Sequence, residues 1–338
     1  MGSPSDRKWL QITGIGINLF KGGVFMRKKW LSILMLGSVF TLILSGCGKS
    51  GNVGAPSGKM QVVTSIYPLE DFTEKIGGSH VQVTNLVPPG VEPHDYDLKP
   101  RDLMLLSQSD LFIYNGAGLD PYAEKVKQSL DPEKTEVVNA TRHIRLLSPE
   151  EEGKQGDGHS GSSRDPHVWL DPVLAKQEAL AIRDALIAKD PKHRADYEKN
   201  YEQLARRFDR LNQEFKELAD KAPQKEFAVS HAAFGYLAKR YGLHQLAVSG
   251  LSPEDEPSPR ELEQIIQQLR AHHIHVILFE TLVSGKIAEV VKRDVKAEAG
   301  VLNPIEGLTK EEKAQGKDYF SLMEENKINL AKALGVSR

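Results

Sequence analysis

The sequence predicts an α/β protein of two lobes, each with a parallel sheet, joined by a long helix. Its 338 residues exceed the usual size of one compact domain, so two domains are expected. Short β-rich runs alternate with helical stretches in two parts of the chain, which is typical of parallel α/β sheets. A strand-free section, residues 172–221, separates these parts. We therefore assign residues 60–171 and 222–338 to the two lobes.

The first predicted lobe alternates four strands with helices. Helical patterns cover Leu69–Ile76 and Pro100–Ser107 between the strands. The predicted strands are Gln61–Ser65, Val81–Val87, Asp110–Asn115 and Thr135–Asn139. Because strands and helices alternate, we expect the strands to pair in parallel.

The section between the lobes holds two helical segments, separated by Asp190-Pro191. The second, His193–Lys221, would run roughly 40 Å at 1.5 Å per residue. Apolar residues recur on it every three or four positions and form one stripe: Tyr197, Tyr201, Leu204, Phe208, Leu211 and Phe215. A coiled coil is the competing interpretation, but the pattern does not persist over enough heptads.

The second predicted lobe resumes the alternation after Ala222-Pro223. Its helices are Pro259–His272 and Lys286–Ala299. The predicted strands are Phe227–Ser230, Gln245–Val248, Val276–Phe279 and Gly300–Leu302. The sequence shows no internal repeat between the two lobes.

The N-terminal region has the features of an export signal. A basic group, Arg27-Lys28-Lys29, precedes an apolar run from Leu31 to Leu44, which is too short to span a bilayer comfortably. The run ends in Leu44-Ser45-Gly46-Cys47, which resembles a bacterial lipoprotein signal, residues 26–47, with Cys47 as the acylated residue. Residues 48–59 then form a flexible tether. We expect translation to begin at Met26, which makes residues 1–25 a non-native extension.

Charge and cysteine content exclude several kinds of site. The net charge is −2 for the full sequence and −7 for residues 48–338, which carry 38 basic and 45 acidic residues. This charge gives no reason to expect a nucleic-acid partner, which would call for a basic patch or stripe. The single cysteine, Cys47, excludes an intramolecular disulfide and any cysteine-rich metal site. Metal chemistry would therefore depend on nitrogen and oxygen donors, and eleven histidines are present.

Four short segments place possible metal donors where predicted strands end. They centre on His94, His167, His231 and Glu306, and His231 is expected to follow a strand directly and to open a helix. Ligands of open α/β sheets bind beyond the carboxyl ends of the strands. Two lobes facing each other would bring all four segments to one cleft between them.

Together these segments carry a resemblance to a known family. In order, the lipoprotein signal, P-H-D-Y, D-P-H-V-W-L-D-P, S-H-A-A-F and N-P-I-E resemble the cluster A-I substrate-binding lipoproteins of metal ABC transporters. The resemblance covers the chain from Met26 onward. It implies two Rossmann-like α/β lobes, a long rigid linking helix and a metal buried between the lobes. It also implies a monomer, anchored by lipid to the outer face of the cell membrane, that delivers its metal to an ABC permease.

Carried over residue by residue, the resemblance implies metal ligation by His94, His167, His231 and Glu306. Histidine at the third position is similar to zinc-type members, whereas manganese-type members have a carboxylate there. Three imidazoles and one carboxylate suit tetrahedral Zn²⁺ better than Mn²⁺. A manganese- or iron-binding homologue remains the alternative. Many zinc-type members carry a histidine-rich loop before the second ligand, but here residues 148–165 hold only His159.

Several other polar residues are weaker candidates for the site. Asp95, Asp97 and Asp165 are candidates to hydrogen-bond the second nitrogens of the ligand histidines. Glu280, at the end of a predicted strand, is expected to face the same cleft and to support the ligands. Helix caps or loop carboxylates are the alternative for each. The run Ala271-His272-His273-Ile274-His275 resembles a second metal site, but alternation along a strand prevents its side chains from converging. We interpret it as an exposed strand edge.

Two other functions compete with metal delivery. A zinc hydrolase would need an open coordination position and a general base, for which Glu280 is available. However, the sequence holds no H-E-x-x-H segment, and four protein donors would close the coordination shell. The chain is therefore predicted not to be an enzyme. The third possibility is an adhesin or structural lipoprotein of the same cell-adhesion class, stabilised by a metal that does not exchange.

Overall fold

The computed structural model describes residues 58–148 and 164–336. Residues 56–338 group into one compact unit. Several predicted features lie outside the described residues. They are the extension 1–25, the signal peptide with Cys47, the tether up to residue 57, and His159. None of the described helices is both long enough and apolar enough to cross a bilayer.

The first lobe contains a four-stranded parallel sheet. Its elements are β1 (Met60–Thr64), α1 (Tyr67–Gly77), β2 (Val81–Asn85), α2 (Pro100–Gln108), β3 (Leu111–Tyr114), α3 (Ala123–Ser129) and β4 (Glu136–Asn139). The strand order is β2-β1-β3-β4, and Val62 of β1 pairs with Val83 and Leu111. All four residues of β3 are buried because helices cover both faces of the sheet.

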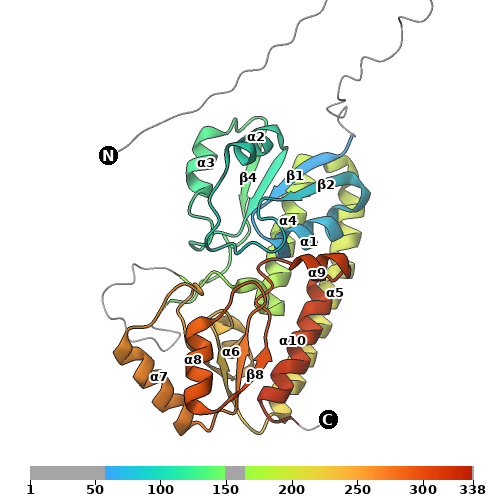
Figure 1. The fold of residues 1–338 in the computed structure, drawn as a ribbon. Coiled ribbons are helices and arrows are strands. Elements are labelled where there is room, and N and C mark those ends of the chain that lie inside the picture. Colours follow the sequence, from blue (N-terminus) through green and yellow to red (C-terminus); the bar gives the residue numbers. More distant parts are fainter. Residues whose placement is uncertain (1–57, 149–163, 337–338) are drawn as a thin grey trace, which may run out of the picture. The chain divides into compact units, whose positions relative to one another are not determined.

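Two helices link the lobes. They are α4 (Pro172–Lys189) and α5 (Arg194–Lys221), and the break between them falls at Asp190-Pro191 as predicted. Five residues of the predicted stripe on α5 are buried, whereas Tyr201 is half-buried. Phe208 packs edge-on against Phe72 of α1 and also contacts Phe320. The apolar stripe therefore packs inside the molecule, and the coiled-coil alternative is wrong (Figure 1).

The second lobe contains a second parallel sheet with the same connectivity. Its elements are β5 (Glu226–Val229), α6 (Gly235–Tyr241), β6 (His244–Ala247), α7 (Pro259–Ala271), β7 (Val276–Phe279), α8 (Lys286–Val295), β8 (Glu298–Val301), α9 (Lys310–Ala314) and α10 (Tyr319–Ala333). The order β6-β5-β7-β8 repeats the order of the first sheet. The two lobes are therefore structural repeats that the sequence does not reveal.

Two predicted boundaries in the second lobe are wrong. The helix predicted for Lys286–Ala299 ends at Val295, because Lys296 takes a left-handed conformation with φ of 59° and β8 begins at Glu298. His231 does not open a helix, since α6 begins at Gly235. Helix α10, which packs beside α5, was not predicted.

Hydrogen bonds from loops at the strand ends join the lobes. The Gly90 amide donates to the carbonyl of Leu308, and the Tyr67 amide donates to the carbonyl of Glu306. The indole of Trp169 donates to the carbonyl of Pro304 at 2.7 Å. The carboxyl ends of the two sheets therefore face a shared junction, which Figure 1 shows near α9 and the top of the second lobe.

Candidate metal centre

The four predicted ligands meet at this junction. Each of His94, His167, His231 and Glu306 offers one donor atom, and the four atoms all lie within 4.8 Å of one another. His94 comes from the loop after β2 and His231 from the loop after β5. Glu306 follows β8, and His167 precedes a 3₁₀ turn, Val168–Leu170, that leads into α4.

The spacing of the donor atoms matches a tetrahedral ion. Glu306 Oε1 lies 3.1 Å from His167 Nε2, 3.4 Å from His231 Nε2 and 3.5 Å from His94 Nε2. The Nε2 atoms of His94 and His167 are 3.3 Å apart. A tetrahedron with metal–ligand bonds of 2.0–2.1 Å has edges of about 3.3 Å. Four of the six donor pairs therefore already have the spacing of a zinc tetrahedron, and the other two lie within 4.8 Å.

His167 is fully buried and is oriented by Asp165. Its backbone amide and its Nδ1 both donate to Asp165 Oδ1, at 2.9 and 2.8 Å. These bonds place the proton on Nδ1 and leave Nε2 to face the other ligands. Burial lowers the pKa of His167, but the hydrogen bonds to Asp165 and Glu306 outweigh it and raise the pKa above its usual value.

His231 is oriented in the same way by Glu280. Its Nδ1 lies 3.0 Å from Glu280 Oε1, which also accepts a hydrogen bond of 3.0 Å from the Ser230 hydroxyl. Burial lowers the pKa of His231, yet the hydrogen bond to Glu280 and the nearby carboxylate of Glu306 raise it to about 10. In the metal-free protein both nitrogens of this imidazole therefore carry a proton.

Glu306 is held in place by a strained backbone. The residue before it, Ile305, has φ of 58°, which is rare for a β-branched residue. The Asn303 side chain accepts a hydrogen bond of 2.8 Å from the Ile305 amide and fixes this turn. Burial raises the pKa of Glu306, but the hydrogen bond from His167 and the facing imidazoles of His231 and His94 lower it well below the usual range. The carboxylate is therefore ionised and available to a cation.

His94 differs from the other two histidines because none of the described carboxylates accepts a hydrogen bond from its Nδ1. Its side chain is 11% exposed, its Nε2 faces His167 and Glu306, and its ring lies edge-on to that of His231. Asp95 and Asp97 are exposed, and none of the hydrogen bonds among the described residues joins either of them to a histidine of the centre. Of the predicted supporting residues, the structure brings Asp165 and Glu280 to the centre and leaves Asp95 and Asp97 at the surface.

Sequence reasoning missed Glu92, two residues before His94. Its Oε1 accepts a hydrogen bond of 3.1 Å from the His94 amide. Burial and the neighbouring Glu306 raise its pKa to about 9. No spacing rule in the sequence separates Glu92 from the exposed carboxylates Asp95 and Asp97.

Several buried polar atoms around the centre have no hydrogen-bond partner. They are Glu92 Oε2, Asp165 Oδ2, His231 Nε2, Glu280 Oε2 and Glu306 Oε2. Buried polar atoms are nearly always paired, so unpaired donors and acceptors concentrated at one point call for a ligand. Four of the five atoms are carboxylate oxygens, which favours a cation.

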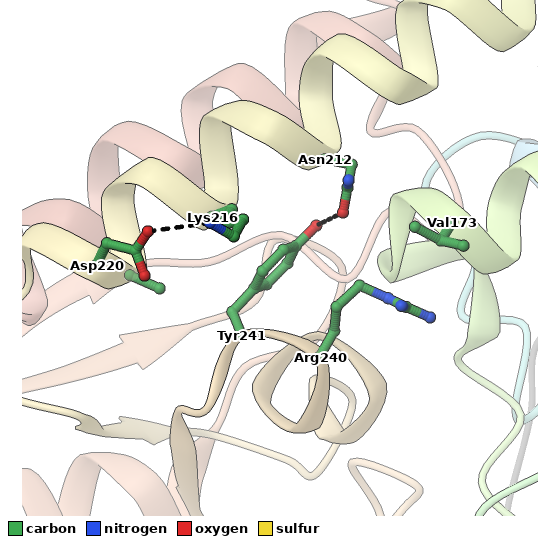
Figure 2. Close-up of a pocket in the computed structure, with 7 residues that line it drawn as sticks. Val173, Asn212, Lys216, Asp220, Arg240 and Tyr241 are labelled. Carbon is green, nitrogen blue, oxygen red and sulfur yellow. Dashed lines mark hydrogen bonds and ion pairs between the residues drawn. The ribbon is translucent and has the colours of Figure 1, made fainter.

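Two other regions fail as metal sites. His272, His273 and His275 are exposed at the start of β7, as predicted, and the group around Glu306 is the only possible metal cluster found among the described residues. A cavity of about 310 Å³ lies between α4, α5 and α6 (Figure 2). It is lined by Lys216 and Arg240, whose charges are paired with Asp220 and Asp171.

Comparison with known proteins agrees with this centre. A family model described as zinc-uptake complex component A, periplasmic, matches residues 62–333. The high-affinity zinc uptake system protein ZnuA of Bacillus subtilis is 36% identical over 308 residues, which cover 89% of this chain and 96% of that protein. The zinc-binding lipoprotein AdcA of Streptococcus pneumoniae is 35% identical over 297 residues, but these cover only 59% of AdcA, against 87% of this chain.

Solved structures show the same fold. The Zn(II)-bound ZnuA-like domain of Streptococcus pneumoniae AdcA matches with a TM-score of 0.70 and 34% identity, covering 82% of this chain and 99% of that one. The laminin-binding protein Lmb of Streptococcus agalactiae, described as having adhesin and metal-transporting activity, matches with a TM-score of 0.72 and 32% identity. That match covers 81% of this chain and 99% of Lmb.

Proposed function

This chain belongs to the family of the periplasmic zinc-uptake complex component A, and we propose that it captures Zn²⁺ with His94, His167, His231 and Glu306. The family is a component of a transport complex rather than an enzyme, so the bound ion is cargo for an ABC permease. Binding must therefore be reversible, and the protein passes the ion on unchanged.

The observation that carries the proposal is the donor set and its spacing. Four of the six pairs among the three imidazole nitrogens and the carboxylate oxygen lie 3.1–3.5 Å apart, close to the edge of a zinc tetrahedron. Mn²⁺ favours oxygen donors and a higher coordination number, so this arrangement favours Zn²⁺ over the manganese or iron alternative. A hydrolase would need a water in the fourth position, which Glu306 occupies.

We further propose that Cys47 is acylated and anchors the protein to the outer face of the membrane as a monomer. The support is the basic group and short apolar run before Leu44-Ser45-Gly46-Cys47. Mass spectrometry of the native protein tests the anchor: a free thiol on Cys47, or an uncleaved N-terminus, would contradict it.

We also propose the boundaries of the lobes. They are residues 60–171 and 222–338, with the linking helices between them.

Zinc titration of the metal-free mature protein tests the function. We expect one Zn²⁺ per chain, displacement by a chelator without unfolding, and weaker binding of Mn²⁺ in direct competition. A zinc ion that leaves only when the protein unfolds would instead indicate a structural metal. Preferential retention of Mn²⁺ would support the manganese alternative.

A further inference from the structure

The short helix that follows His231 contacts the segment that carries His167. By its place in the chain this segment, residues 165–171, ends the first lobe, whereas α6 lies in the second lobe. Each of the two stretches therefore adjoins one of the buried ligand histidines. The contacts between them bear directly on how these two ligands are held relative to each other.

Tyr236 of α6 holds the beginning of the segment. Its hydroxyl donates a hydrogen bond of 2.8 Å to the carbonyl of Asp165, the residue whose carboxylate orients His167. The same hydroxyl accepts a hydrogen bond of 2.9 Å from the Leu147 amide. The side chain is buried, and its ring lies in one apolar cluster with Leu147 and Val168. Both hydrogen-bonding capacities of the hydroxyl are thus used to fix the backbone next to His167.

Arg240, one helical turn after Tyr236, holds the end of the segment. Residues four positions apart lie on the same face of a helix, so the two side chains project from one face of α6. The Arg240 guanidinium pairs with the buried carboxylate of Asp171. Asp171 also caps α4 by accepting a hydrogen bond of 2.9 Å from the Val173 amide. One face of α6 therefore contacts both ends of the segment.

Other hydrogen bonds also join the segment to the second lobe. The Trp169 indole donates to the carbonyl of Pro304, and the Tyr319 hydroxyl donates to the carbonyl of Trp169. From the first lobe, the Asn115 side chain donates a hydrogen bond of 3.0 Å to the carbonyl of Pro166. The segment that carries His167 therefore packs against the second lobe along most of its length.

We propose that Tyr236 and Arg240 are positioning residues that fix the His167 segment to the lobe that carries His231. The two buried imidazoles, whose ring centroids lie 5.5 Å apart, then form one preorganised half of the zinc site. Neither positioning residue touches the ion. Preorganised ligands bind more tightly because less conformational freedom is lost on binding. The proposal rests on the proposed function, because it takes Zn²⁺ as the ion that both imidazoles bind.

Tyr236→Phe tests the proposal because it removes the hydroxyl and keeps the ring. We expect zinc affinity, measured by competition with a chelator, to fall by about three- to tenfold. Tyr241→Phe is the matched control: Tyr241 lies in the same helix, but its hydroxyl donates to Asn212 of α5 at 3.1 Å (Figure 2). We expect the control to keep its zinc affinity, even where both variants lower the midpoint of unfolding.

A double-mutant cycle separates positioning from a general loosening of the fold. In a His94→Ala background, Tyr236→Phe should keep its effect of about three- to tenfold, because the His167 ligand is still present to be held. In a His167→Ala background the effect should fall below about twofold, because the segment no longer carries a ligand. A general loosening of the fold would weaken zinc binding equally in both backgrounds.

Arg240→Gln tests the other end of the segment and should weaken zinc binding in the same direction. This variant leaves the buried Asp171 without its ion-pair partner, so circular dichroism first checks that it folds. If it does not fold, Tyr236→Phe decides the question.

Three results would overturn the proposal. They are unchanged zinc affinity in Tyr236→Phe or in a folded Arg240→Gln variant, an equal loss in Tyr241→Phe, and an equal effect of Tyr236→Phe in the two histidine backgrounds. Failure of the unaltered protein to bind one Zn²⁺ would instead refute the proposed function.

Discussion

The two sides of the metal centre are built differently. On one side, His167 and His231 are completely or almost completely buried, and each is held by a carboxylate, Asp165 or Glu280. On the other side, His94 is 11% exposed, and within the described parts of the chain its Nδ1 has no carboxylate acceptor. Orienting hydrogen bonds fix the rings of the two buried histidines, whereas the His94 ring, although its Nε2 lies 3.3 Å from that of His167, has no such bond among the described residues. We therefore expect the held histidines to contribute most to binding strength and His94 to govern exchange.

The largest expected effect comes from removing a ligand on each side. His231→Ala should weaken zinc binding by on the order of 10³-fold, because it also leaves Glu280 and Glu306 buried beside a missing partner. His94→Ala should cost less, about 10- to 100-fold, and should mainly accelerate dissociation. Competition titration with a chelator and stopped-flow release measure both quantities. Equal losses of zinc affinity in the two variants would show that the held histidines and His94 contribute alike.

A smaller effect is expected from removing an orienting carboxylate. Asp165→Asn should weaken zinc binding by about 10- to 100-fold, because the acceptor that fixes the His167 ring loses its charge. Asp95→Asn is the matched control, and we expect no measurable change because Asp95 is exposed and makes no described hydrogen bond to the centre. Similar weakening in both variants would show that net charge, rather than orientation, matters.

The held histidines also predict how binding and stability depend on pH. His231 has an unfolded-state pKa of about 6.5 and a pKa of about 10 in the folded, metal-free protein. Its proton therefore stabilises the metal-free fold fully below pH 6.5, and this contribution is lost as the pH rises through 10. Zinc must displace the same proton, so the affinity of the folded protein for zinc should rise by about tenfold per pH unit for each proton released, up to about pH 10.

Calorimetry in buffers of different ionisation enthalpy measures that release. We expect proton release on zinc binding at pH 8 in the unaltered protein and less of it in His231→Gln. The sequence alone predicted that binding weakens only below about pH 6.5, the ordinary histidine value. The structure moves the onset upward because Glu280 and Glu306 retain the proton. Zinc binding at pH 8 without proton release would contradict this account.

The smallest effect concerns a buried carboxyl group that orients nothing. Glu178 of α4 is fully buried, and neither of its oxygens has a hydrogen-bond partner. Burial raises its pKa well above the usual value. Glu178→Met should therefore stabilise the protein by about 1–3 kcal/mol at pH 7 without changing zinc affinity. Denaturant unfolding measures this, with the exposed Glu202→Met as the control; destabilisation would mean that Glu178 has an unidentified partner.

Much of the fold was predictable because local patterns matched the final structure. The buried strands and the stripe on α5 have the expected periods, and Asp190-Pro191 interrupts the helices where proline must. The end of α8 was mispredicted because Lys296 adopts a left-handed turn that no glycine or asparagine signals. The repeated sheet order was not predictable, since it depends on strand pairing rather than on similar residues.

The ligand positions followed from the placement of polar residues after strands, but their surroundings did not. Asp165 and Asp95 are similar in sequence, each within two residues of a predicted ligand histidine. One is buried against its histidine and the other is exposed, because the second lobe covers only the segment around His167. Tyr236 of α6, for example, donates a hydrogen bond of 2.8 Å to the Asp165 carbonyl. Glu92 was missed for the same reason.

X-ray absorption spectroscopy of the zinc-loaded mature protein tests the central claim most directly. The account predicts four-coordinate Zn²⁺ with three imidazole nitrogens and one carboxylate oxygen at 2.0–2.2 Å. In His94→Ala, one imidazole should be replaced by a water oxygen while the other two remain. A six-coordinate, oxygen-rich shell in the unaltered protein, or loss of more than one imidazole in the variant, would contradict it.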